Sequence, residues 1–443
     1  MRKLIVLLFL SPVFLAAQKN YTALLDNYMQ AQANVNDFMG TVLVAKKGKI
    51  IYEKAFGMAD RELNVPNTLQ TKFQVGSVTK QFTAACILQL AAEGKLNLAD
   101  KLSKYFPDFP KGDSVTIHML LTHTSGIKNY TELPAFWKQM SLPLEKDSMV
   151  AIFKNQPYNF PPGTKWSYSN SGYFLLGYII EKVSGKSYSD YVLKNVIEKA
   201  GLKNTSVNRW DSILTNRAKG YGKGPGGWKN AMYISMEGPY SAGAIISTIE
   251  DLQQWNNALF SNKIMSPALF NKMITPYLDN YGYGIGIDSF QHHLLIGHSG
   301  GIPGFASYLG RFPTDDLVVA GLANNGDSPT QNIVTALAAI VFDIPVIPPY
   351  HHKEVNIDSL VFKKYTGKYS RDVTHVDTVM TKDGKLYWHA WWGGESLMKP
   401  ESNTKFFLEN APDIQVEFET GNNGLPVKYY LVEAGIKSEM KKL

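Results

Sequence analysis

A serine and a lysine three residues apart carry the first chemical signal in the chain. Ser77 and Lys80 stand in the order Ser-Val-Thr-Lys, at the start of a run of helix-forming residues that ends at Gly94. Residues three apart share one face of a helix, so the hydroxyl and the amine can meet. A serine needs a base to take its proton, and a partly desolvated lysine becomes one by losing its charge. The pair predicts nucleophilic catalysis, although a helix cap beside a surface lysine has the same spacing.

Three further segments follow in the chain. They are Leu120–Ile127, which reads LLTHTSGI, Tyr168-Ser169-Asn170, and His298-Ser299-Gly300-Gly301. Together with the string Phe73–Ala84 around Ser77, these motifs resemble the serine β-lactamase and penicillin-binding protein family. The resemblance is closest to the branch of class C β-lactamases, D-specific peptidases (peptidase S12-like) and esterases, and it covers roughly residues 21–343.

The resemblance implies roles for residues of the family's first motif, here Ser77 to Lys80, and of its second motif, here Tyr168-Ser169-Asn170. Ser77 is similar to the family's nucleophile and Lys80 to its proton acceptor. Tyr168 matches the tyrosine that carries a proton to the leaving group, and Asn170 matches the residue that orients the substrate and Lys80. We therefore expect an acyl-enzyme on Ser77 that water hydrolyses.

The family's third motif, here His298-Ser299-Gly300, departs from its most common form. His298 stands where a lysine is frequent, with Ser299 and Gly300 as substrate-binding neighbours, and the amides of Ser77 and Gly301 resemble the oxyanion hole. A lysine keeps a charge suited to a substrate carboxylate, whereas histidine is only partly charged near neutral pH. The resemblance therefore favours hydrolysis of D-amino-acid peptides, amides or esters. A β-lactam-hydrolysing enzyme and a non-hydrolytic penicillin- or peptidoglycan-binding sensor remain alternatives.

A second catalytic motif overlaps this segment. Residues 297–301 satisfy Gly-x-Ser-x-Gly, the nucleophile elbow of α/β-hydrolases, which would make Ser299 the nucleophile. An elbow is followed by a helix, whereas Ile302-Pro303-Gly304-Phe305 and the alternating residues after it indicate a second strand. Ser299 is therefore the less favoured nucleophile.

The other side chains that could be reactive are expected to have structural roles. Cys86 lies on an apolar helix and is expected in the core, since free cysteines are usually buried. His123 is interpreted as structural, within the Leu120–Ile127 loop. The pairs His292-His293 and His351-His352 lack an evident third ligand, and adjacent strand residues face opposite sides. We expect no metal and no cofactor.

Composition excludes several classes of protein. The chain has 443 residues, of which 19% are charged and 44% hydrophobic, a globular balance. Its net charge of +7 is scattered, with no concentrated basic face to bind nucleic acid. A single cysteine excludes an internal disulfide. The expected partner is a small-molecule or peptide substrate, peptidoglycan-derived ones included.

The N-terminus carries a targeting pattern. Arg2 and Lys3 precede an apolar run that ends at Ala16-Ala17, before Gln18. This is typical of a secretory signal peptide, because a membrane-spanning helix needs about 20 apolar residues. We expect an exported, periplasmic or secreted protein without a stable membrane anchor after cleavage.

Strand-like and helix-like segments are grouped along the chain, which predicts an α+β fold with an antiparallel sheet and a helical cluster. Prolines after Ile344 indicate a linker, and short alternating segments after it indicate a small all-β barrel or sandwich. The predicted units are a signal peptide at 1–17, a β-lactamase-like hydrolase domain at 18–344, a Pro-rich linker at 345–358 and a C-terminal β-domain at 359–443. The predicted helices are one that begins near Ser77, Thr116–Thr122, Asn170–Ser184 and Thr248–Phe260, and the predicted strands that frame the third motif are Tyr281–Ile287, His293–Ile296, Ala306–Phe312 and Leu317–Ala323.

Overall fold

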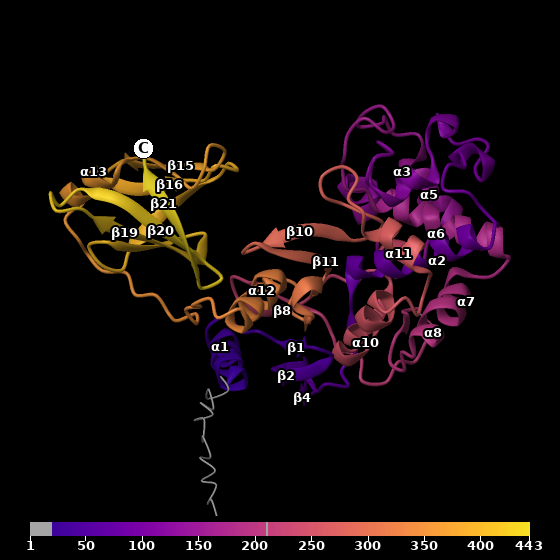
Figure 1. Ribbon diagram of the computed structural model, residues 1–443, viewed down its shortest axis with the longest axis horizontal. Helices are drawn as coiled ribbons and strands as arrows, with labels where there is room; N and C mark the ends of the chain where they lie inside the picture. The colour runs from indigo at the N-terminus through magenta and orange to yellow at the C-terminus, as the bar shows by residue number, and fades with distance from the viewer. Residues whose placement is uncertain (1–19, 210) are drawn as a thin grey trace, which may run out of the picture.

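An antiparallel sheet forms the centre of the molecule in a computed structural model, which describes residues 20–209 and 211–443. Its six strands lie in the order β10-β11-β12-β13-β1-β2. Two strands come from the start of the domain and four from its end, so the helices between them form a separate layer (Figure 1). The strands are β1 (Gly40–Lys46), β2 (Lys49–Phe56), β10 (Gly286–Phe290), β11 (His293–Ile302), β12 (Phe305–Phe312) and β13 (Leu317–Ala323). The predicted α+β class is confirmed.

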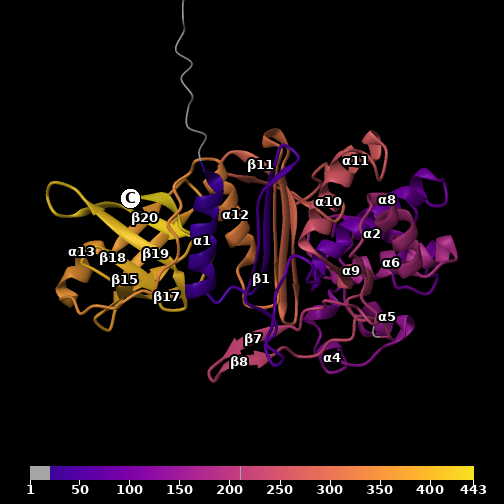
Figure 2. The ribbon, with the colours of Figure 1, turned by 90° about the horizontal axis from the view of Figure 1, so that it is seen from below.

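Both faces of this sheet are covered by helices. In β1, Leu43 joins the core on one face, while Val42 and Val44 join the core on the other, as the period of two in a strand requires. Helices α1 (Tyr21–Val35) and α12 (Thr330–Val341) pack on the second face. Figure 2 shows these two helices between the sheet and the C-terminal barrel, and the helical cluster on the opposite side.

The helical cluster surrounds α2 (Thr79–Ala92), in which every residue from Thr79 to Leu90 is buried. A helix that is buried on all sides lies inside a large core, and here that core places Lys80 out of contact with water. The surrounding helices are α3 (Ile117–Leu121), α4 (Pro134–Trp137), α5 (Lys146–Lys154), α6 (Asn170–Ser184), α7 (Tyr188–Val192), α8 (Glu198–Ala200), α9 (Tyr240–Gly243), α10 (Ile249–Phe260) and α11 (Pro267–Ile274). Short strands lie between and beside them: β3 (Met58–Asp60), β4 (Val65–Pro66), β5 (Phe73–Gln74), β6 (Ser206–Val207), β7 (Tyr221–Gly224), β8 (Gly227–Asn230) and β9 (Ile245–Ser247).

One strand near the third motif begins later than predicted. The segment Tyr281–Ile287 was expected to be a strand, but β10 begins at Gly286. Gly284 turns with a φ of +69°, and a Cβ there would lie 2.5 Å from the carbonyl oxygen of Lys80. This segment therefore packs as a loop against the first turn of α2, which local alternation of residues does not reveal.

The C-terminal segment forms a closed antiparallel barrel rather than a sandwich. Two of its strands, β17 (Glu395–Pro400) and β21 (Ile436–Lys442), were not predicted. The alternating segments that predicted the other strands are Tyr365–Ser370, Val373–Thr381, Lys385–Trp392, Lys405–Leu408, Ile414–Glu419 and Val427–Val432. In β21 the buried residues Ile436 and Met440 are four apart, so the sequence lacks the alternation of a half-buried strand. The barrel strands are β14 (Gly367–Ser370), β15 (Val376–Lys382), β16 (Lys385–His389), β17 (Glu395–Pro400), β18 (Lys405–Leu408), β19 (Ala411–Thr420), β20 (Pro426–Glu433) and β21 (Ile436–Lys442), after the short helix α13 (Phe362–Tyr365).

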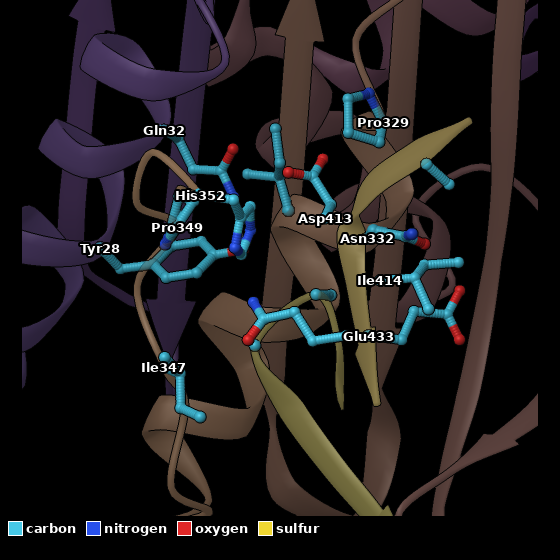
Figure 3. A pocket seen from close by; sticks show the side chains of 15 residues that line it. Tyr28, Gln32, Pro329, Asn332, Ile347, Pro349, His352, Asp413, Ile414 and Glu433 are labelled. Carbon is cyan, nitrogen blue, oxygen red and sulfur yellow. The ribbon is translucent and has the colours of Figure 1, made fainter. Parts of the chain in front are cut away.

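An extended segment connects the two units. Residues 344–358 contain no helix or strand, and the Ile347 N–H donates to the carbonyl oxygen of Gly435 at 2.9 Å. A Cβ on Gly435 would lie 2.2 Å from the Ile347 oxygen, so glycine permits this approach. The segment, α1, α12 and the barrel together enclose a pocket (Figure 3) that includes Tyr28 and Asp413. The barrel is thus seated on the α1/α12 layer.

The predicted signal peptide, residues 1–17, lies outside the described residues. From residue 20 onward, with residue 210 left aside, no helix has both the length and the apolar character needed to cross a bilayer.

A substitution of Asp377 tests how much its buried hydrogen bonds stabilise the barrel. It is fully buried, and it accepts hydrogen bonds from the Trp388 indole at 3.1 Å, the Tyr429 hydroxyl at 2.5 Å and the Trp391 backbone at 2.9 Å. Asp377→Asn replaces an acceptor with a donor, so we expect the barrel to lose about 2–3 kcal/mol of stability. The same change at the exposed turn residue Asp383 is the control, and urea-dependent hydrogen exchange of barrel peptides is the measurement. Equal stability of both variants would contradict this role of Asp377.

Candidate active site

Ser77 lies where the chain enters α2. It belongs to a 3-10 turn, Gly76–Val78, and its side chain is half-buried. Gly76 has a φ of +50°, and a Cβ there would lie 2.8 Å from the backbone nitrogen of Gly301. Glycine at this position therefore allows the turn that carries Ser77 to approach strand β11 closely.

Lys80 is fully buried one helical turn after Ser77. Its Nζ lies 2.9 Å from Ser77 Oγ, 2.8 Å from Asn170 Oδ1 and 2.8 Å from the carbonyl oxygen of Ala242. Among the described residues, no carboxylate forms an ion pair with it. Burial without a counter-charge disfavours the ammonium and holds the pKa of Lys80 well below its ordinary value.

Asn170 is held at the start of α6. Its backbone N–H donates to Asn129 Oδ1 at 3.1 Å, and its side-chain Nδ2 donates to the same oxygen at 3.4 Å. This second contact points the amide Nδ2 away from Lys80, so the carbonyl oxygen faces the amine. The structure thus brings Asn170, Lys80 and Ser77 into one hydrogen-bonded group.

Tyr168 lies beside the same amine. Lys80 Nζ is 4.8 Å from the centre of the Tyr168 ring, and the ring centres of Tyr168 and His123 are 4.3 Å apart. Burial raises the pKa of Tyr168, and an interaction with the Ser77 hydroxyl opposes this rise only in part. The phenol therefore keeps its proton at neutral pH and can act as a donor.

His298 is buried with both ring nitrogens occupied. Nδ1 lies 2.5 Å from the carbonyl oxygen of Ser299, which can only accept, so Nδ1 carries the proton. Nε2 lies 2.8 Å from the Tyr281 hydroxyl and accepts from it. Burial lowers the pKa of His298 to about 4, although the bond to Ser299 opposes this shift. The third motif therefore presents a neutral imidazole.

The other residues of the third motif differ in their surroundings. A Cβ on Gly300 would lie 2.1 Å from the carbonyl oxygen of Val75, whereas at Gly301 it would meet nothing within 4 Å. Gly300 thus permits the contact between β11 and the turn before Ser77, and Gly301 faces the pocket that Ser77 lines. Ser299 is exposed within β11, and a strand rather than a helix follows it. It is not on a nucleophile elbow.

The comparisons with known proteins agree with this arrangement. The family model described as Beta-lactamase matches residues 25–341. The chain belongs to the β-lactamase family. This confirms the resemblance found in the sequence and makes the chain a member of a family of serine hydrolases with the β-lactamase fold.

Three proteins that are similar to this β-lactamase-family chain match it over nearly all of their own length. Penicillin-binding protein 4* of Bacillus subtilis (strain 168) is 30% identical, over 94% of this chain and 97% of that protein. The octameric penicillin-binding protein homologue from Pyrococcus abyssi has a TM-score of 0.68 at 27% identity and covers 95% of this chain and 99% of its own. The D-amino acid amidase from Ochrobactrum anthropi SV3 has a TM-score of 0.63 at 25% identity, over 72% of this chain and 97% of its own.

Two residues of the site were not identified from the sequence as part of it. Tyr281 was assigned to a strand, but its hydroxyl holds His298. His123 was interpreted as structural; it accepts from the Ser169 backbone at 3.1 Å and packs on Tyr168. The only available signal was their aromatic or titratable character, because both contacts join segments that are distant in the sequence.

The neutral state of His298 gives a prediction for its titration. Its pKa falls from an ordinary 6.5 to about 4 on folding, so below 6.5 the unfolded chain binds a proton that the folded protein does not. Because of His298, we expect the free energy of unfolding to decrease as the pH falls from 6.5 to about 4. A His298→Gln variant should lack this part of the decrease. Nitrogen-15 NMR of the ring should show an Nδ1–H tautomer in the wild type. An imidazole that titrates near 6.5 would contradict the assignment.

Proposed function

We propose that the protein is an exported serine hydrolase that forms an acyl-enzyme on Ser77. One observation carries the proposal: a buried lysine, which has no carboxylate partner among the described residues, lies 2.9 Å from a serine hydroxyl. A neutral amine has two hydrogens and one lone pair. Its two hydrogens match the Asn170 and Ala242 oxygens, which can only accept, so the lone pair is directed at the Ser77 hydroxyl.

In the acylation step, Lys80 takes the Ser77 proton while Oγ attacks the substrate carbonyl carbon. The carbonyl oxygen becomes an oxyanion, and the amides of Ser77 and Gly301 stabilise it by about 3–4 kcal/mol each, as single donors do in comparable sites. Tyr168, which remains protonated, passes a proton to the leaving group, and Lys80 restores that proton to the phenol. The products are an ester on Ser77 and a free alcohol or amine, whose leaving oxygen or nitrogen has gained the proton.

In the deacylation step, water replaces the leaving group. The Tyr168 and Lys80 pair removes a proton from the water as its oxygen attacks the acyl carbon, and the tetrahedral intermediate releases the acid and regenerates Ser77. Asn170 holds Lys80 in place throughout, since its amide orientation is fixed by Asn129.

We assign D-amino-acid peptides, amides or esters as the substrate class. The neutral His298 supports this choice over substrates that need a fixed positive charge to bind a carboxylate, such as penicillins. The likeness to a D-amino acid amidase supports it as well. Peptidoglycan-derived peptides fall within this class. The N-terminal targeting pattern supports a periplasmic or secreted location.

Covalent labelling tests the nucleophile. We expect a fluorophosphonate to add one adduct to the wild type and to Ser299→Ala, and none to Ser77→Ala, as measured by intact mass. Circular dichroism of each variant verifies its fold. An adduct on folded Ser77→Ala would overturn the proposal.

Labelling with a penicillin separates the alternatives within the family. For a hydrolase of esters or amides we expect no persistent adduct on Ser77. An adduct that survives for hours would instead support the penicillin-binding sensor.

A further inference from the structure

Strand β11 has a free edge beside the catalytic serine. Its pairing with β10 ends where Gly286 lies opposite Gly297, so residues 298–302 are paired only with β12. Three pockets follow this edge in chain order. Gly297 to Ser299 line the first, Gly301 to Pro303 the second, and Pro303 and Phe305 the third. An extended substrate along this edge would pass all three pockets.

The first pocket, which we call the acidic pocket, lies on the Tyr168 and His298 side of the serine. Its lining includes the exposed carboxylates Asp279 and Asp288, and no lysine or arginine among the described residues lines it. Nor does either carboxylate have an ion-pair partner within the described part of the chain. In a chain of net charge +7, this negative pocket stands out.

The second pocket, the apolar pocket, contains Ser77 itself. Aromatic and aliphatic side chains form its walls, among them Tyr130, Phe136, Trp137 and Ile302, and none of its described lining residues is charged. Burying an apolar group here costs no desolvation of a charge.

The third pocket, the basic pocket, shares Ile234 and Pro303 with the apolar pocket and so continues it. Arg209, Arg217 and Lys219 line it. Arg209 pairs with Asp211, and Lys219 pairs with Asp60 and Glu62, whereas Arg217 has no acidic partner among the described residues. The charge along the β11 edge therefore changes from negative, through neutral at Ser77, to positive.

The position of Tyr168 determines which of the pockets receives the leaving group. Tyr168 lines the acidic pocket, and in the proposed mechanism it protonates the departing group. Gly301, whose amide holds the oxyanion, lines the apolar pocket with Ser77. The leaving group therefore departs toward Asp279 and Asp288, and the acyl group remains among the aromatic walls.

We propose that the substrate joins an apolar acyl group to a leaving group that carries a positive charge, and that Asp279 and Asp288 select this charge. The inference rests on the proposed function, since it needs Ser77 to be acylated. The bond that breaks is the acyl carbon's bond to the leaving oxygen or nitrogen, and the products are an apolar acid and a cationic alcohol or amine. A leaving group with a carboxylate is disfavoured by the same two aspartates. The inference therefore narrows the proposed substrate class to esters and amides with a cationic leaving group, over peptides that lose a C-terminal residue.

Three phenylacetyl esters of similar size test the inference. Their leaving groups are choline, which is cationic, 3,3-dimethylbutanol, its neutral isostere, and 3-hydroxypropanoate, which is anionic. Release of phenylacetate gives kcat/KM for each ester with wild type, with Asp279→Asn/Asp288→Asn and with Asp383→Asn as a matched control. Comparing ratios of kcat/KM between variants cancels the intrinsic reactivity of the esters.

We expect the ratio of kcat/KM for the choline ester to kcat/KM for the neutral ester to fall about three- to tenfold in the double variant. This is the range of effect for two exposed carboxylates. The ratio should stay unchanged in the control. The 3-hydroxypropanoate ester should be hydrolysed faster by the double variant, and high salt should reduce both effects. Unchanged ratios with Ser77-dependent hydrolysis would overturn the inference alone. Failure to hydrolyse any of the esters, with Ser77 still labelled by a fluorophosphonate, would overturn the apolar acyl site. Hydrolysis that persists in Ser77→Ala would overturn the proposed function instead.

Discussion

The site depends on the burial of one amine, for which the described part of the chain supplies no counter-charge. Lys80 lies on a helix whose residues are buried from Thr79 to Leu90, and its three contacts are a hydroxyl, an amide oxygen and a backbone oxygen. A carboxylate among these partners would hold the ammonium form and remove the base. The core that stabilises the helical cluster therefore also sets the protonation state of its most reactive group.

The backbone of the turn before α2 approaches the backbone of β11 closely, and this contact brings the other catalytic groups near Lys80. Gly76 and Gly300 leave no room for a Cβ where the turn before α2 meets β11, and Gly284 fits against Lys80 in the same way. Through these contacts the sheet presents His298 and the Gly301 amide to Ser77, which belongs to the helical cluster. A larger side chain at Gly300 would separate the nucleophile from its oxyanion donors.

Short sequence motifs predicted the main catalytic residues, whereas the contacts that complete the site join segments that are distant in the sequence. Ser77 and Lys80 could be paired from the sequence because helix geometry links residues three apart, and α6 begins at Asn170 as predicted. The bond between Tyr281 and His298 could not be foreseen, since it depends on how a loop packs against α2. Likewise, β21 closes the barrel through pairing with β14, a contact between segments that local pattern does not connect.

The pH dependence of Ser77 labelling tests the neutral amine most directly. The second-order rate constant for reaction with a fluorophosphonate reports how readily Ser77 loses its proton. With Lys80 as a base of depressed pKa, the rate should fall at acidic pH and reach its plateau well below the lysine's ordinary value of 10.5. A rate that keeps rising up to pH 10.5 would show a charged Lys80 at neutral pH and contradict the central claim.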